Sequence, residues 1–162
     1  MFTIIVSIGK NGEIGVKNDL IWRIPEDMRF FRMMTINHKV VMGRKTFESL
    51  PNGKLSDREN FVVTTNTSIN LPEDINIISD FESFLKENYS SEEEIFIIGG
   101  EKIYKLALPY VNKMIITHID REEKNADAYF NPDLSEKIWK KNGLVLCDCE
   151  NIKYCRTEYT RI

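Results

Sequence analysis

The chain has 162 residues, of which 42% are hydrophobic and 29% are charged, a composition typical of a globular protein. A domain of this length buries roughly two thirds of the surface of its unfolded chain, so it needs no disulfide or metal for folding. The 22 basic and 25 acidic residues give a net charge of −3, without the basic excess of proteins that bind nucleic acid or anionic membranes. We expect one domain over residues 1–162, with neither nucleic-acid nor membrane partners.

The location and the cysteine chemistry follow from local composition. The N-terminal stretch "MFTIIVSIGKNGEIG" lacks the basic start and cleavage site of a signal peptide, and no apolar run approaches the roughly 20 residues of a membrane span. We therefore expect a cytoplasmic protein. Cys147, Cys149 and Cys155 are odd in number and lack metal-ligand spacing, so we expect reduced thiols. His38 and His118 have no ligand cluster around them, and no metal site is predicted.

Short apolar runs alternate with helical patterns along the chain. The runs predict buried strands at 2–8, 39–43, 60–65, 75–79, 94–100 and 113–119, and the patterns between them predict helices at 25–35, 44–50, 80–88 and 101–108. This alternation predicts an α/β fold with a single, mainly parallel central sheet flanked by about four helices. The runs 143–150 and 154–162, separated by "NIK", predict an antiparallel C-terminal hairpin. Segments 9–24 and 120–138 are long enough to be functional loops.

One acidic residue lies in an unusual place in the helix predicted at 25–35. At about 100° per residue, Asp27 falls in the same apolar stripe as Phe31 and Met34, whereas Glu26 lies off it and is expected to be solvated. A helix-start role remains an alternative, because acids are favoured in the first turn and Pro-Glu-Asp recurs at 72–74 in a predicted loop. A buried carboxylate needs a partner, so Asp27 is a candidate ligand-binding residue.

A second candidate site lies at 40–50, "VVMGRKTFESL". A strand ends at Gly43, and a helix opens with Arg44 and Lys45, where cations are unfavourable unless an anion binds between them and the free amides. The arrangement suits phosphate. The alternative is an ion pair between Arg44 and Glu48, four residues further on.

A third candidate site lies at 95–104, "IFIIGGEKIY", where a strand ends in Gly99-Gly100 before a helix. Paired glycines at the carboxyl end of a strand allow a ligand to approach the backbone, although a tight turn alone would explain them equally well. Neither this motif nor "GKNGEIG" at 9–15 is the G-x-G-x-x-G fingerprint, so a Rossmann dehydrogenase is disfavoured.

These motifs, taken together and in order, resemble the dihydrofolate reductase family over essentially the whole chain. The matching segments are "IGVKNDLIW" (14–22), "IPEDMRFF" (24–31), "VVMGRKTFES" (40–49), "DREN" (57–60), "IIGGEKIY" (97–104), "LPYVNKMIITHI" (108–119) and the segment "FNPD" (130–133), which is similar to an F-x-P-D pattern. The resemblance implies NADPH-dependent reduction of 7,8-dihydrofolate to tetrahydrofolate, a step of one-carbon and thymidylate metabolism, with hydride transfer to pterin C6 and protonation at N5. It also implies a monomer that binds antifolate-type small molecules and has a cis peptide between Gly99 and Gly100.

The resemblance also assigns roles to residues. It implies that Asp27 binds the 2-amino group and N3 of the pterin, that Thr117 hydrogen-bonds the Asp27 carboxylate and that Trp22 helps to place a water. The implied substrate-binding residues are Ile5, Leu20, Met28, Phe31, Leu50, Leu55, Ile98 and Arg58, which would grip the glutamate tail. The implied NADPH-binding residues are Ser7, Ile14, Gly15, Asn18, Gly43, Arg44, Lys45, Thr46, Ser49, Thr64, Thr65, Gly99, Gly100, Lys102, Ile103 and Tyr104.

Two alternatives stay open beside this hypothesis. One is a related pterin or pyrimidine reductase of the same fold, against which the acid at Asp27 and the aromatic at Phe31 argue. The other is a non-catalytic module that binds NADPH. The chain departs from the family pattern at Ile21, in the "KLSDR" segment at 54–58 and at Asn131, so the surrounding loops are expected to differ.

Overall fold

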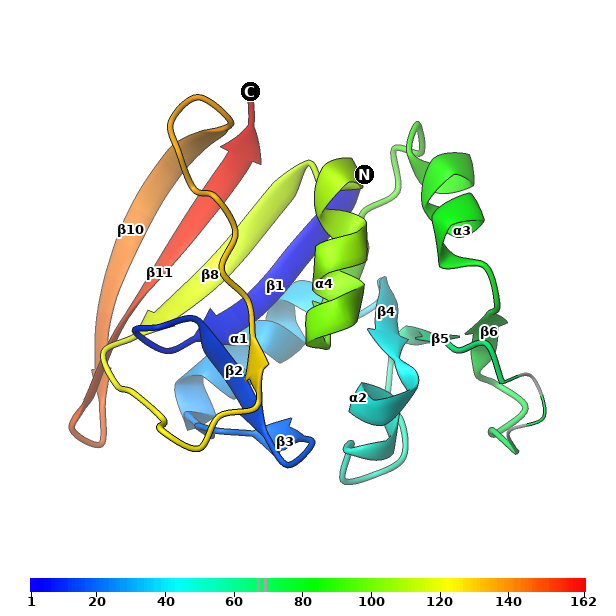
Figure 1. The fold of residues 1–162 in the computed structure, drawn as a ribbon, viewed down its shortest axis with the longest axis horizontal. Coiled ribbons are helices and arrows are strands. Elements are labelled where there is room, and N and C mark those ends of the chain that lie inside the picture. Colours follow the sequence, from blue (N-terminus) through cyan, green and yellow to red (C-terminus); the bar gives the residue numbers. More distant parts are fainter. Residues whose placement is uncertain (67, 69) are drawn as a thin grey trace.

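The computed structural model describes residues 1–66, 68 and 70–162. These residues form an eight-stranded central sheet in the order β10-β11-β8-β1-β7-β4-β5-β6 (Figure 1). Neighbours from β8 to β6 pair in parallel, and β11 pairs antiparallel with both β8 and β10. The strands are β1 Phe2–Ile8, β4 Lys39–Gly43, β5 Glu59–Val63, β6 Asn76–Ile78, β7 Ile95–Gly99, β8 Lys113–Ile119, β10 Trp139–Cys149 and β11 Ile152–Arg161. The predicted parallel sheet with a C-terminal hairpin is confirmed.

Helices cover both faces of this sheet. They are α1 Pro25–Thr35, α2 Arg44–Glu48, α3 Phe81–Asn88 and α4 Glu101–Ala107, followed by the 3₁₀ helix η1 Leu108–Tyr110. In Figure 1, α1 lies behind the sheet, and α3 and α4 lie in front of it. Side chains alternate along β1, so Ile4 packs in one core cluster with residues of α3 and α4, while Ile5 packs in another with residues of α1. Burial on both faces explains the nearly continuous apolar strands.

Three segments differ from their predictions, which are two loops and the turn of the C-terminal hairpin. The predicted loops 9–24 and 120–138 contain short strands, β2 Glu13–Val16, β3 Asp19–Leu20 and β9 Ala128–Tyr129, which pair as a separate sheet in the order β3-β2-β9. Strands of two to four residues carry too little periodicity to be predicted. The hairpin turn is Glu150-Asn151, with φ of 49° and 64°, rather than "NIK". Positive φ at both central residues matches the twist of a two-residue hairpin.

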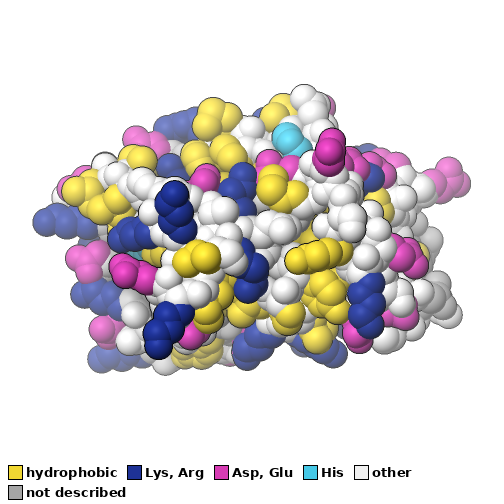
Figure 2. All heavy atoms as spheres, turned by 90° about the horizontal axis from the view of Figure 1, so that it is seen from above, with side chains coloured by type: hydrophobic (Ala, Val, Ile, Leu, Met, Phe, Trp, Pro, Cys, Tyr) yellow, Lys and Arg dark blue, Asp and Glu magenta, His cyan; other side chains and the backbone are white. Residues whose placement is uncertain are grey.

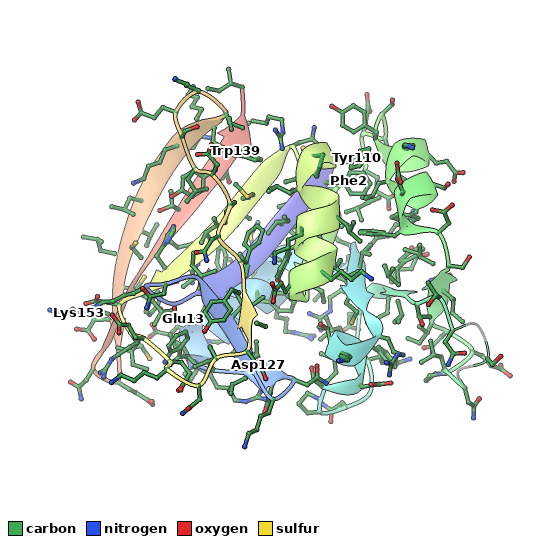
Figure 3. All side chains as sticks on the ribbon, viewed as in Figure 1. Phe2, Glu13, Tyr110, Asp127, Trp139 and Lys153 are labelled. Atoms are coloured by element: carbon green, nitrogen blue, oxygen red, sulfur yellow. The ribbon has the colours of Figure 1, made fainter. Side chains whose placement is uncertain are left out.

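The buried Glu13 joins the two long loops, and Figure 3 labels it on β2, beside the segment that carries Asp127. Its carboxylate accepts hydrogen bonds from the Asn11 amide N–H at 2.8 Å and from the Glu123 amide N–H at 3.3 Å. Burial alone raises the pKa of Glu13, but hydrogen bonds from backbone N–H groups and from the Asn11 side-chain amide together outweigh it and leave the pKa below its usual value. The Lys17 N–H donates to Asp127 at 2.9 Å, which forms a second link between the loops.

We expect Glu13→Gln to lower the free energy of unfolding by about 1–3 kcal/mol at pH 7, because the amide NH₂ would face N–H donors. Because the pKa of Glu13 is lower in the folded than in the unfolded protein, its ionised carboxylate stabilises the fold above pH 4.5, the usual pKa. This stabilisation is lost as the pH falls through the folded-state pKa. The difference between the two proteins should therefore shrink below pH 4.5 in urea unfolding. Glu122→Gln, on an exposed side chain in the same loop, is the control. Equal stabilities of wild type and Glu13→Gln at pH 7 would contradict the expectation.

The surface carries charges of both signs. Basic and acidic side chains are interspersed with apolar ones on the face in Figure 2. None of the helices within residues 1–66, 68 and 70–162 is long and apolar enough to cross a membrane.

Cys147, Cys149 and Cys155 are free thiols on β10 and β11, as predicted.

Candidate active site

A cleft of about 310 Å³ opens between α1, the loop that carries β2 and β3, and the ends of the central strands. Many of its lining residues are apolar, among them Ile5, Phe31 and Ile98, and Asp27 lies within it. A larger groove of about 670 Å³ runs along the C-terminal hairpin, but it contains neither Asp27 nor the glycines at the carboxyl ends of β4 and β7. The smaller cleft is therefore the candidate site.

Three adjacent strands present a row of donors to Asp27. The register pairs Ser7 of β1 with Thr117 of β8, and Thr117 with Arg156 of β11, so all three side chains emerge on the face that carries α1. Thr117 Oγ1 donates to Asp27 Oδ1 at 2.8 Å, Arg156 Nη2 donates to the same oxygen at 2.7 Å, and Ser7 Oγ donates to Oδ2 at 2.5 Å. We call Ser7, Asp27, Thr117 and Arg156 the acid cluster.

The acid cluster changes two expectations. Sequence reasoning named the substrate and Thr117 as partners of Asp27, whereas Arg156 also forms an ion pair with it. Ser7, which was assigned to the cofactor, donates its hydroxyl to the acid. Alternation along β11 places Arg156 and Tyr154 on one face, but only the strand register reveals that this face meets Asp27. Glu26 is exposed as expected, yet it accepts a hydrogen bond from the buried Tyr154 hydroxyl at 3.1 Å.

The predicted substrate residues gather around the acid, with one exception. The cleft is lined by Trp22 and Thr117, and also by Ile5, Leu20, Met28, Phe31, Leu50, Leu55 and Ile98. Arg58 lies outside the lining and donates to the Ser56 carbonyl at 2.8 Å and to Thr35 Oγ1 at 3.1 Å. Burial lowers the pKa of the Arg58 guanidinium, and repulsion from Arg32 adds to this.

The predicted cofactor residues divide into two groups. Ser7, Ile14, Gly15, Asn18, Thr46, Ser49, Gly100 and Tyr104 line the cleft. The others are outside the lining, at or just after the carboxyl ends of β4, β5 and β7: Gly43, Arg44, Lys45, Thr64, Thr65, Gly99, Lys102 and Ile103. These strands are neighbours, and parallel strands end at the same edge, so both groups share one side of the sheet.

The two glycine turns, at Gly43 and at Gly99-Gly100, pack closely with their surroundings. A Cβ at Gly43 would lie 3.1 Å from Ile103, and one at Gly100 would lie 3.3 Å from Thr46 Oγ1. The peptide between Gly99 and Gly100 is cis, as the resemblance implied. Only residues without side chains leave room there for the backbone to face a ligand.

Two contacts within the protein involve α2 at this edge of the sheet. Asn18 Nδ2 donates to the Lys45 carbonyl at 2.9 Å and ties the loop 9–24 to the start of α2. Arg44 pairs with Glu48 at 2.6 Å, which was the alternative to phosphate binding. Because both side chains are largely exposed, the pair is worth only a few tenths of a kcal/mol and leaves Arg44 able to exchange partners.

Tyr104 connects the glycine turn to the base of the cleft. Its hydroxyl donates to the Ile5 carbonyl at 3.1 Å, and complete burial raises the pKa of Tyr104. The phenol is therefore a neutral donor that positions β1 against α4. The cleft has further lining residues that sequence reasoning did not name: Val6, Asp19, Arg23, Phe30, Pro51, Glu101, Asp127 and Ala128.

Comparison with known proteins identifies this architecture. A family model described as dihydrofolate reductase matches residues 1–161. The dihydrofolate reductase of Buchnera aphidicola subsp. Acyrthosiphon pisum (strain APS) is 39% identical over 138 residues, which are 85% of this chain and 83% of that protein. The enzyme of Staphylococcus haemolyticus is 38% identical over 141 residues, 86% of this chain and 81% of that protein.

A solved structure agrees with these relatives. The dihydrofolate reductase from Enterococcus faecalis, complexed with NADP(H) and RAB-propyl, matches with a TM-score of 0.88 at 26% identity, over 99% of this chain and 96% of that chain. The family model, the relatives and the shared fold all extend over most of the chain. This protein therefore belongs to the dihydrofolate reductase family.

Proposed function

We propose that the chain catalyses the NADPH-dependent reduction of 7,8-dihydrofolate to 5,6,7,8-tetrahydrofolate. Family membership supports this reaction. The observation that carries the proposal for the site is the buried acid cluster in a mainly apolar cleft beside the two glycine turns. An apolar cleft with a few fixed polar groups suits a flat heteroaromatic ring, because apolar walls bind its faces and a carboxylate orients its N–H groups.

In the proposed site, Asp27 accepts hydrogen bonds from the 2-amino group and N3–H of the pterin ring. Phe31, Met28 and Ile5 contact the faces of the ring, and Leu20, Leu50, Leu55 and Ile98 complete the walls. Thr117 and Ser7 hold the carboxylate in a fixed orientation, since each donates to a different oxygen. Such preorganisation replaces solvent reorganisation during the reaction.

The residues beside the glycine turns fit the cofactor. Arg44, Lys45 and Thr46 would hold phosphate groups at the start of α2, where backbone N–H groups are free. The backbone of Gly43, Gly99 and Gly100 would face the dinucleotide, together with Lys102, Ile103 and Tyr104. Arg44 and Thr65 would lie near its 2′-phosphate, and Thr64 would also contact the cofactor. Ile14, Gly15, Asn18 and Ser49 would flank the nicotinamide. When bound, NADPH supplies the hydride.

The protein has two chemical tasks, which are to align the reacting atoms and to provide a proton at N5. Alignment in a closed cleft removes much of the entropic barrier. In the proposed pose, Asp27 binds the far side of the ring from N5, so it acts by polarising the ring, and a water placed with the help of Trp22 delivers the proton.

Arg58 would bind the carboxylate of the glutamate tail, next to Arg32. We expect Arg58→Gln to raise KM for dihydrofolate by about 10-fold to 100-fold with little change in kcat, because the tail contact is equal in the ground and transition states. Steady-state kinetics with dihydrofolate and with a dihydropterin that lacks the tail check this expectation. An equal rise in KM for the tail-less substrate would exclude the assigned role.

A spectrophotometric assay of dihydrofolate-dependent NADPH oxidation tests the proposed function. Turnover with dihydrofolate but not with the pyrimidine substrate of the riboflavin pathway supports it, whereas the reverse pattern identifies the related reductase. NADPH binding without consumption of NADPH identifies a non-catalytic module.

The proposal also covers the assembly and location of the protein. One domain over residues 1–162, acting as a monomer in the cytoplasm, agrees with the continuous central sheet and the mixed surface charge. Sedimentation equilibrium across a range of concentrations tests the monomer.

A further inference from the structure

Arg156 forms the most deeply buried ion pair among the residues that the structure describes. The side chains of Arg156 and Asp27 are 13% and 14% exposed, whereas the next pair, Lys113 and Glu94, is 17% and 20% exposed. Burying an ion pair carries a desolvation cost that attraction only partly offsets. The pair is therefore weak evidence for a stabilising role of Arg156, whereas its effect on the charge of the site is direct, because the cation is next to the acid.

Three contacts fix the Arg156 guanidinium. Nη2 lies 2.7 Å from Asp27 Oδ1, Nε lies 3.4 Å from Thr117 Oγ1, and the guanidinium carbon lies 3.6 Å from the centroid of the Phe30 ring. Pairing between β11 and β8 holds its backbone directly opposite Thr117. The positive charge is thus held on the acid and shielded from water by an aromatic ring that lines the cleft.

Other charges of the cleft have their own partners. Asp19 pairs with Arg23 at 2.6 Å, with both side chains about half exposed. Glu101 pairs with Lys105, and Asp127 accepts the Lys17 N–H. Among the cations of the described chain, Arg156 is the one that contacts Asp27.

We propose that Arg156 is a specificity-determining residue of the substrate site that acts through Asp27. Its charge offsets that of the carboxylate, so the cleft favours an uncharged pterin ring over a ligand ring that carries a positive charge. This inference rests on the proposed function, in which Asp27 receives the ring.

The preference follows from charge and poor screening. An ionised carboxylate alone attracts a protonated heterocycle, but a cationic ring bound to Asp27 would also meet the repulsion of the guanidinium on the same oxygen. Little water separates these groups, so the repulsion is weakly screened. An uncharged ring keeps its hydrogen bonds to the carboxylate without this penalty.

Two probes of different charge test the proposal in the intact protein with NADP⁺ bound, so that no turnover occurs. Folate has an uncharged ring, and a 2,4-diaminopyrimidine is a base that a carboxylate binds in its protonated form. Quenching of protein fluorescence, to which Trp22 in the cleft contributes, gives both Kd values. The decisive quantity is the ratio of the folate Kd to the diaminopyrimidine Kd.

We expect Arg156→Met to raise this ratio by about 10-fold or more, through tighter binding of the protonated diaminopyrimidine and little change in folate binding. Arg156→Lys, which keeps the charge, should leave the ratio within about 3-fold of wild type. Arg156→Gln removes the charge but stays polar, and it takes the place of the Met variant if that protein fails to fold. Arg29→Met removes an exposed charge from α1 and should not move the ratio.

Two outcomes would overturn the inference. If Arg156→Met and Arg156→Gln weaken both probes by the same factor, Arg156 has only a structural role. If Arg156→Lys shifts the ratio as far as Arg156→Met does, charge is not the cause. If the wild-type protein does not oxidise NADPH in the presence of dihydrofolate, the proposed function is refuted. If it does, but Arg156→Met leaves the ratio of the two Kd values unchanged, only this inference is refuted.

Discussion

Asp27→Asn is expected to lower kcat/KM for dihydrofolate at pH 7 by about 100-fold or more, the size of effect associated with assistance of proton transfer. Asparagine keeps a similar shape but cannot polarise the ring as an anion. Activity should partly recover as pH falls, because substrate that is already protonated in solution needs no such assistance. Kinetics of the two proteins across the pH range check both parts.

Glu26→Gln is the matched control for this variant. Glu26 precedes Asp27 on α1, but it is exposed and accepts a hydrogen bond from Tyr154 rather than from the acid cluster. Its kcat/KM should stay within about 2-fold of wild type. Since Asp27→Asn leaves the Arg156 charge without its anion, urea unfolding of this variant separates lost stability from lost catalysis. Full turnover by a folded Asp27→Asn protein at pH 7 would refute the role of the acid.

Gly99→Ala is expected to lower the free energy of unfolding by about 2–4 kcal/mol and to weaken NADPH binding. Gly99 has φ of 116°, which residues with a side chain rarely adopt, and a Cβ would lie 3.1 Å from two ring carbons and the hydroxyl oxygen of Tyr104. Tyr104 is buried and anchored to the Ile5 carbonyl, so it cannot move aside without displacing β1 or α4. Urea unfolding and NADPH titration measure the two effects.

Gly53→Ala separates strain from steric overlap. Gly53 also has positive φ, at 74°, but a Cβ there would meet nothing within 4 Å. This variant should lose only about 1 kcal/mol, the cost of the backbone conformation. If Gly99→Ala were no less stable than Gly53→Ala, the close contact with Tyr104 would carry no energetic weight.

Local patterns were sufficient for much of the fold and part of the site. A strand buried on both faces is apolar along its whole length, so β1, β4, β7 and β8 were visible as runs of sequence. Helical periodicity placed Asp27 among apolar neighbours, and the cleft contains it. The short strands β2, β3 and β9 were missed because two to four residues carry too little periodicity, and because β9 forms by pairing with β2, which is distant in the chain.

The sequence by itself determined the strand and helix pattern, the family and the acid on the apolar face of α1, since each depends on residues close together in the chain. Only the tertiary structure decided what meets that acid. Arg156 lies 129 residues from Asp27, and the strand order and register of β1, β8 and β11 align Ser7, Thr117 and Arg156 in one row. A slip of one residue would turn Arg156 to the opposite face of the sheet. The composition of β11 carries no local signal of that register, so the charge balance of the site emerges only when the sheet is assembled.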